Sequence, residues 1–303
     1  MEERGMNARI KALRKLSLDT PAHIDLERAL SETATYKKYE GELSVPELRG
    51  QVLKDYFSTK TLYIGEGELI VGEKGDSPQA APTFPELCCH TVEDMHVMND
   101  RDLINFRVKE TDYKVQEEVM IPYWEKRSMR SRILRQMTPE WKDAYEAGIF
   151  TEFMEQRGPG HTVGSVKIYE KGFLDYKEDI QNAIDKLDFM NDTEAFDKKN
   201  ELEGMKLACD AIMILGERYA AYARELAAKE GDAGRREELL QIAANCDVAV
   251  SYTHLDVYKR QELYSAHFTE TFSGLSRLPS AALSWLGSYW KAEICSIIVS
   301  FIL

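Results

Sequence analysis

The feature that most constrains the fold is a long apolar stripe in the second half of the chain. Its members recur every three or four residues: Leu202, Met205, Cys209, Ile212, Gly216, Tyr219, Ala223 and Leu226. This spacing places them on one face of a helix of about seven turns, so a long helix with one buried face is predicted. The sequence GDAG (231–234) interrupts the pattern, and a second amphipathic helix is expected from Arg235 to Cys246. Together they predict an αα-hairpin and a mainly α-helical fold.

The N-terminal region has start and stop signals for two further helices. Asp25 precedes the helical run 26–39 as a candidate N-cap, and Gly41 lies just past its end. Pro46 suits the first position of a second helix, which is expected to end near Phe57.

The segments that follow contain turn-forming and β-branched residues. The runs TLYI (61–64) and ELIVG (68–72) are short and apolar with glycines between them, which predicts a small β-hairpin. Residues 73–90 have closely spaced glycines and prolines and are expected to form an ordered loop. A Thr-Pro pair at 138–139 predicts a helix start, and Gly148 predicts its end.

The charge of the chain limits its partners. A formal charge of −13 and a pI near 5.1 oppose binding to nucleic acid or to an anionic membrane, since both require a basic face. Residues 1–250 carry all of this charge, whereas residues 251–303 have four basic and four acidic side chains. We therefore expect residues 1–250 to be the folded part and residues 251–303 to be a tail rather than a domain. Five cysteines without C-x-x-C spacing predict reduced thiols in the cytoplasm.

The segment EFMEQRGPGHTV (152–163) has the layout of a binding site. A helix-competent run ends at Arg157, where Gly-Pro-Gly at 158–160 imposes a non-helical turn. The turn could bring Phe153 and His161 together as an apolar and a titratable wall. From the residues alone, His161 has three interpretations: a general acid, a ligand contact, or a turn histidine bonded to the backbone.

Cys88, Cys89, His90 and His96 are potential metal ligands that lie close together in the sequence. Structural zinc usually requires two separated ligand pairs, and the sequence has no second pair. We therefore expect a packed loop here and no metal. Cys209 lies within the apolar stripe and is interpreted as a core residue rather than a reactive thiol.

Six stretches of the sequence together resemble one enzyme family. They are YKKYEG (36–41), GELIVGEKGDSP (67–78), APTFPELCCHTVED (81–94), NDRDLINF (99–106), MTPEWKDAYEAGIFTEFMEQRGPGHTV (137–163) and KGFLDYKEDI (171–180). They are similar to the N-terminal part of glycyl radical enzymes of the pyruvate formate-lyase-like family, and within it to dehydratases of hydroxyproline. The resemblance runs from about Asn7 to about Val248.

The resemblance implies a fold, a reaction and two site residues. The family fold is a ten-stranded α/β barrel wrapped by helices, to which this chain would contribute mostly outer helices and one wall of the active site. The implied reaction removes water from trans-4-hydroxy-L-proline to give 1-pyrroline-5-carboxylate. Phe153 corresponds to an aromatic wall of the substrate pocket, and His161 to a histidine near the departing hydroxyl, which requires a proton donor.

The resemblance also implies partners for the full-length parent enzyme. A separate activating enzyme with an iron–sulfur cluster and S-adenosylmethionine would install the glycyl radical, which oxidises a cysteine to a thiyl radical. The parent is expected to be a cytoplasmic homodimer in an anaerobe, because oxygen destroys a glycyl radical.

The chain departs from the family pattern at the residues that carry the radical. The family's thiyl cysteine follows a glycine, whereas none of the five cysteines here does, and no Arg-Val-x-Gly-Tyr-like loop supplies a radical glycine. Family members are more than twice as long. Residues 251–261, SYTHLDVYKRQ, resemble translated adapter read-through, so a non-native tail is expected. A hydrophobic anchor is the alternative, but the final uncharged run of about ten residues is too short to span a bilayer. We therefore expect an inactive fragment.

Two other interpretations of function remain open. The parent could be another glycyl radical lyase, such as a choline or diol eliminase or a formate C-acetyltransferase-like enzyme. The chain could instead be a non-enzymatic helical interaction module, which predicts a monodisperse protein that unfolds cooperatively.

Overall fold

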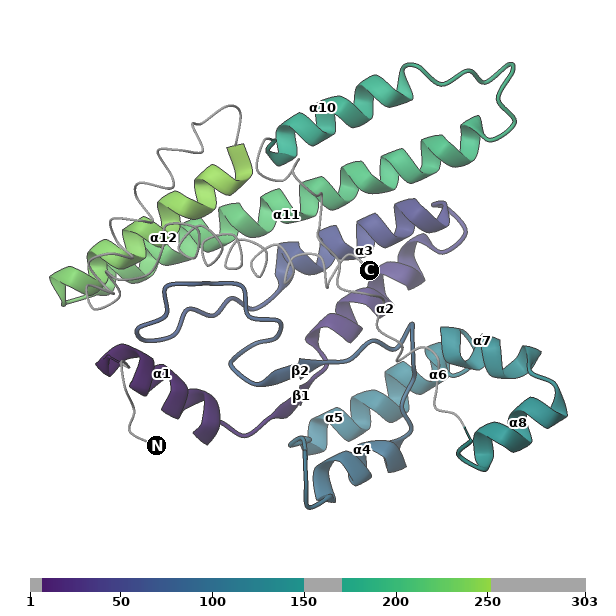
Figure 1. Ribbon diagram of the computed structural model, residues 1–303, viewed down its shortest axis with the longest axis horizontal. Coiled ribbons are helices and arrows are strands. Elements are labelled where there is room, and N and C mark those ends of the chain that lie inside the picture. The colour runs from purple at the N-terminus through teal and green to yellow at the C-terminus, as the bar shows by residue number, and fades with distance from the viewer. Residues whose placement is uncertain (1–6, 150–170, 252–303) are drawn as a thin grey trace, which may run out of the picture. The chain divides into compact units, whose positions relative to one another are not determined.

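The computed structural model describes residues 7–149 and 171–251, which form two compact units. Unit 1 comprises residues 7–16, 39–72 and 171–251, and unit 2 comprises residues 17–38 and 73–149. The described elements, labelled in Figure 1, are α1 (Ala8–Asp19), β1 (His23–Asp25), α2 (Glu27–Tyr39), α3 (Val45–Thr59), β2 (Ala80–Pro82), α4 (Val92–Asp100), α5 (Glu110–Val115), the π-helical turn η1 (Gln116–Met120), α6 (Ile121–Trp124), α7 (Met129–Gln136), α8 (Pro139–Glu146), α10 (Phe173–Ile184), α11 (Ala195–Lys229) and α12 (Ala233–Ser251). Helices dominate these residues, as predicted.

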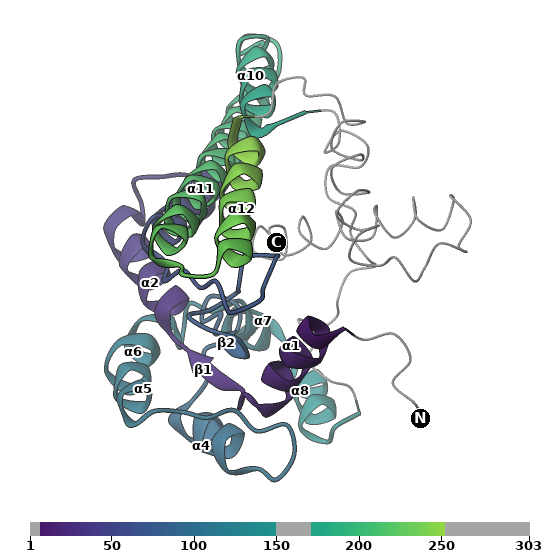
Figure 2. The same cartoon turned by 90° about the vertical axis from the view of Figure 1, so that its left-hand side faces the viewer.

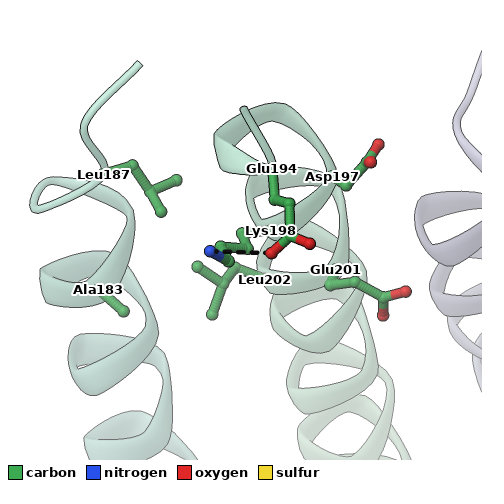
Figure 3. Close-up of a pocket in the computed structure, with 7 residues that line it drawn as sticks. All are labelled: Ala183, Leu187, Glu194, Asp197, Lys198, Glu201 and Leu202. Atoms are coloured by element: carbon green, nitrogen blue, oxygen red, sulfur yellow. Dashed lines mark ion pairs between the residues drawn. The ribbon is translucent and has the colours of Figure 1, made fainter. Parts of the chain in front are cut away.

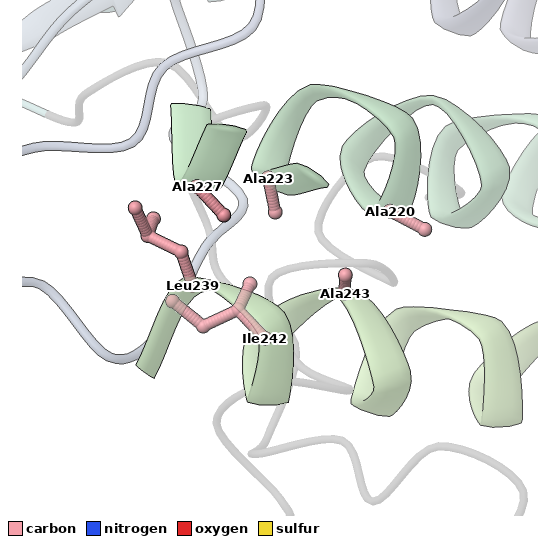
Figure 4. Packing of buried hydrophobic residues seen from close by; sticks show 6 residues of the cluster. All are labelled: Ala220, Ala223, Ala227, Leu239, Ile242 and Ala243. Atoms are coloured by element: carbon pink, nitrogen blue, oxygen red, sulfur yellow. The ribbon is translucent and has the colours of Figure 1, made fainter. Parts of the chain in front are cut away.

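In unit 1, the long helix α11 is the element on which the other helices pack. Figures 1 and 2 show α10 along its first half and α12 along its second half. The predicted αα-hairpin of α11 and α12 is therefore confirmed. Alanines at this interface allow the two helices to approach closely, and two larger side chains of α12 pack against them. The buried cluster in Figure 4 consists of Ala220, Ala223, Ala227, Leu239, Ile242 and Ala243.

Helices α3 and α11 pack together where each of them has a glycine, Gly50 in α3 and Gly204 in α11. A Cβ atom on Gly204 would lie 2.6 Å from the Pro46 carbonyl oxygen, and a Cβ on Gly50 would lie 2.5 Å from the Gly204 carbonyl oxygen. The two helices are therefore in backbone contact at this point, which only glycine permits.

The predicted helix starts and stops agree with the structure. The Asp25 carboxylate accepts a hydrogen bond from the first backbone N–H of α2 at 2.7 Å, and Gly41 has φ +85° beyond its end. Pro46 lies in the first turn of α3. The Thr138 hydroxyl caps α8, and Gly148 follows it with φ +71°. These signals are local, and local signals decide helix ends.

The hairpin predicted between residues 61 and 72 is wrong, because the structure assigns no strand to this segment. Its Ile64 and Val71 side chains pack instead against the α11–α12 interface. The Arg235 guanidinium donates to two backbone carbonyls of the segment at 2.8 and 2.9 Å. Contacts with α12 therefore replace the cross-strand bonds that a hairpin would have made.

The predicted buried stripe of α11 is confirmed in part: Leu202, Gly216 and Leu226 are only half-buried, and Met205 is 56% exposed. Cys209, Ile212 and Tyr219 are buried as predicted. Near its start, α11 is covered by α3 on the side of Gly204, and the next residue lies about 100° around the helix axis. Met205 therefore points away from the covering helix.

In unit 2, β1 and β2 form a two-stranded parallel sheet with His23 opposite Ala80. The loop predicted at 73–90 is confirmed apart from the short strand β2 within it. A buried cluster of Ala29, Met120, Tyr123 and Trp124 joins α2 to η1 and α6.

No described helix is long and apolar enough to cross a membrane.

Candidate functional site

The two predicted pocket residues, Phe153 and His161, lie outside the described residues. The predicted Gly-Pro-Gly turn at 158–160 lies there too. Their roles remain predictions. The described residues contain several polar clusters, whose geometry indicates what each can do.

The Arg28 guanidinium is enclosed by two carboxylates and an aromatic ring. Its Nη1 donates to Glu32 Oε2 at 2.6 Å, and its Nη2 donates to Glu86 Oε1 at 2.7 Å. The Thr83 carbonyl accepts a further bond at 3.3 Å, and the guanidinium carbon lies 4.1 Å from the centre of the Phe84 ring. All three charged side chains are at most 8% exposed. Arg28 therefore attaches the loop after β2 to α2.

Burial of Glu86 opposes its ionisation, but the hydrogen bonds and charge of Arg28 outweigh this effect and lower its pKa. The carboxylate therefore remains ionised at neutral pH and is an unsuitable general base. This cluster was not predicted from the sequence. Only the i, i+4 spacing of Arg28 and Glu32 gave a signal, and such pairs are common on helix surfaces.

His23, Asp76 and Ser77 contain the residue types of a catalytic triad without its geometry. Asp76 Oδ1 lies 3.0 Å from His23 Nε2, and Ser77 Oγ lies 3.4 Å from the same nitrogen. A triad requires the acid and the nucleophile on opposite ring nitrogens. The Asp25 carboxylate also accepts the backbone N–H of Asp76 at 3.0 Å. The cluster therefore holds the loop at 75–77 against β1.

The Cys88–His96 region has no metal-binding geometry. Burial and the charges of Cys88 and Glu125 raise the pKa of Cys89 to about 11. His96 stacks on the Tyr113 ring, with centroids 4.3 Å apart. Among the described residues, no group of three or more His, Cys, Asp or Glu side chains could hold a metal ion.

Cys209 is a core residue, as predicted. It is 8% exposed, and burial together with the neighbouring Asp210 raises its thiol pKa to about 11. Such a thiol is protonated at neutral pH and is a poor nucleophile.

Two lysines share the Asp210 carboxylate within unit 1. Lys54 of α3 lies 3.0 Å from Asp210 Oδ2, and Lys177 of α10 donates to Oδ1. Burial opposes the ionisation of Asp210, but these two bonds lower its pKa. The cluster therefore links three helices.

The chain belongs to the pyruvate formate lyase-like family, whose sequence profile matches residues 3–252. The resemblance stated from the sequence is therefore confirmed.

Individual members of the family differ in how similar they are to this chain. Trans-4-hydroxy-L-proline dehydratase of Clostridioides difficile is 52% identical over 86% of this chain and 33% of its own length. The crystal structure of hydroxyproline dehydratase from the same organism, with trans-4-hydroxy-L-proline bound, superposes with a TM-score of 0.78 at 54% identity, covering 82% of this chain and 32% of that one. A glycyl radical enzyme from Archaeoglobus fulgidus superposes with a TM-score of 0.70 at 28% identity, covering 80% and 31%. This chain thus spans about a third of the length of the relatives it matches.

Proposed function

We propose that this chain is part of a glycyl radical hydro-lyase that removes water from trans-4-hydroxy-L-proline and forms 1-pyrroline-5-carboxylate. The observation that supports this proposal most strongly is the difference in the sequence identity of this chain to two of its relatives. The chain is 52% identical to the hydroxyproline dehydratase, but 27% identical to the isethionate sulfite-lyase of Desulfovibrio desulfuricans. This difference favours hydroxyproline over the substrates of other glycyl radical lyases.

In the proposed enzyme, this chain supplies outer helices and one pocket wall of an α/β barrel. A separate activating enzyme would install the glycyl radical, which would oxidise a cysteine of the parent enzyme to a thiyl radical. The thiyl radical would then start the reaction by removing a hydrogen atom beside the ring nitrogen. Phe153 would pack against the substrate ring, and His161 would donate a proton to the departing C4 hydroxyl, so that water leaves. We propose a cytoplasmic homodimer for the parent, as in the sequence-based expectation.

The chain alone is proposed to be inactive. None of its five cysteines follows a glycine. The raised pKa values of Cys89, Cys209 and Cys246, each about 11, fit thiols in packed surroundings. We further propose that residues 251–303 are not native sequence.

A chimera provides the sharpest test of the substrate. Residues 7–250 of this chain would replace the homologous segment of the Clostridioides difficile dehydratase, and the product would be activated and assayed with hydroxyproline. We expect the chimera to form 1-pyrroline-5-carboxylate, because the pocket wall from this chain and the barrel of the dehydratase would then fit the same substrate. His161→Ala in the chimera should lower kcat by about 100-fold, in the range of lost general acid catalysis, while Phe153→Ala should mainly raise KM.

Two controls make the outcome decisive. The same segment placed in a glycyl radical diol dehydratase should not give hydroxyproline turnover. A chimera that forms a glycyl radical but does not consume hydroxyproline would refute the substrate assignment. Separately, the isolated chain with activating enzyme and S-adenosylmethionine should give no glycyl radical signal by electron paramagnetic resonance, and a signal would refute the proposed inactivity.

A further inference from the structure

The end of the α10–α11 hairpin has an apolar groove that the described residues leave open. The groove, called here the hairpin-end groove, has a volume of about 460 Å³. Figure 3 shows Ala183 of α10 and Leu187, which follows α10, opposite Leu202 of α11 across it. Four large apolar residues nearby are 44–91% exposed: Phe189, Met190, Phe196 and Met205. This concentration of exposed apolar side chains is typical of an interaction surface.

The rim of the hairpin-end groove is acidic. Residues 185–203 contain seven acidic and three basic side chains. The rim cation, Lys198, is already paired with Asp192 at 2.7 Å and Glu194 at 3.2 Å. Asp197 and Glu201 make no ion pair with any described residue, and Figure 3 shows them projecting from the side of α11 away from α10.

We propose that the hairpin-end groove binds a basic amphipathic helix presented by a partner protein. The space between two antiparallel helices accepts the ridge of a third helix, and the apolar floor fits the apolar face of such a helix. Lysine or arginine side chains beside that face would extend over α11 and meet Asp197 and Glu201. A nucleic acid or an anionic membrane is disfavoured, because its charge would be repelled by the rim.

The size of the groove sets the length of the contact. One wall runs from Glu194, the N-cap residue of α11, to Leu202, which is about 12 Å or two helical turns. Met205 extends the same apolar row by almost one turn. The partner helix would therefore use apolar residues at positions i, i+3 or i+4, and i+7, with basic residues flanking them.

The test uses the complete chain and a labelled synthetic helix of leucine and lysine with that spacing. Fluorescence anisotropy should show binding to the chain, and none by a matched peptide of leucine and glutamate. Asp197→Lys with Glu201→Lys should weaken binding at least 10-fold at low salt. Leu202→Asp should weaken it at every salt concentration, since it removes the apolar floor. Circular dichroism would verify that each variant is folded.

A matched control uses two exposed acids elsewhere in unit 1. Glu217→Lys with Glu237→Lys changes the net charge equally and should alter the affinity less than 2-fold. If this control weakens peptide binding as much as the Asp197 and Glu201 reversals do, or if Leu202→Asp does not weaken it, the peptide is held by general charge attraction. Either result would overturn the proposal. No peptide binding would overturn it as well. Self-association of the chain that the Asp197 and Glu201 reversals abolish would assign the groove to a second copy and overturn the partner assignment. None of these outcomes depends on the dehydratase activity.

Discussion

Replacing Gly204 with alanine should destabilise unit 1, although alanine is the better helix former. A Cβ atom at this position would lie 2.6 Å from the Pro46 carbonyl oxygen and 2.7 Å from its carbonyl carbon, whereas ordinary contact begins at 3.4 Å. Both atoms belong to the backbone of α3, so no side-chain rotation relieves the clash. The helices would have to separate by roughly 0.8 Å, and a gap of that size forfeits up to about half of each dispersion contact along the crossing.

The magnitude follows from two opposing terms. Overpacking of this kind costs about 1–3 kcal/mol, and the upper end applies because two backbones meet. Alanine recovers about 1 kcal/mol of helix propensity. We therefore expect the free energy of unfolding to fall by about 2 kcal/mol, measured by urea unfolding followed by circular dichroism.

Gly234→Ala is the matched control for this experiment. Gly234 is exposed in α12, and the nearest atom to its added Cβ is the flexible Asp232 carboxylate at 3.3 Å. This variant should be neutral or more stable by up to about 1 kcal/mol. If Gly204→Ala proves as stable as the wild type while the control behaves as expected, the backbone contact between α3 and α11 does not exist. Gly50→Ala combined with Gly204→Ala should cost less than the sum, because one separation relieves both clashes.

Four further predictions concern buried or partly buried side chains. Arg28→Met should cost about 3–5 kcal/mol in urea unfolding, because it leaves buried carboxylates unpaired, and a loss below 1 kcal/mol would contradict that arrangement. Because the pKa of Glu86 is lowered from its ordinary 4.5, its carboxylate contributes stability above pH 4.5 and loses it as the pH falls through the folded-state value. Glu86→Gln should therefore flatten the acid limb of the stability profile, and an unchanged limb would argue against the assignment. The Cys209 thiol, with a pKa of about 11, should react with a disulfide reagent at neutral pH only after unfolding, as followed by mass spectrometry of labelled peptides. Arg235→Ala should cost about 1–3 kcal/mol and speed amide exchange in residues 61–72, since two carbonyls lose their donor.

Structural features of this chain are predictable from the sequence where the deciding interaction is local. Thr138, Pro46 and Gly148 act within a turn of their own position, so their residue types alone predict the helix boundaries. The stripe of α11 was predicted because one helix face repeats every 3.6 residues. The prediction fails at Met205 because α3, from a distant part of the sequence, decides which side of α11 is covered at this level.

The failures have a common physical cause. The segment at 61–72 has the short apolar runs and intervening glycines of a hairpin, but its apolar side chains pack on α11 and α12, roughly 150 residues away. The Arg28–Glu86 pair joins residues 58 positions apart, and no spacing rule connects them. Phe153 and His161 were identified by family resemblance, while the residues alone left three roles for the histidine.

The crossing of α3 and α11 has a consequence for biosynthesis. The chain leaves unit 1 after residue 72 and resumes it only after unit 2 is complete. Roughly 150 residues therefore separate Gly50 from its contact on α11, and at about 5–20 residues per second the ribosome needs on the order of ten seconds or more to supply them. During that interval the buried face of α3, including Tyr56 and Phe57, has no helix to pack against. A nascent chain of this kind is expected to depend on chaperones until α11 emerges.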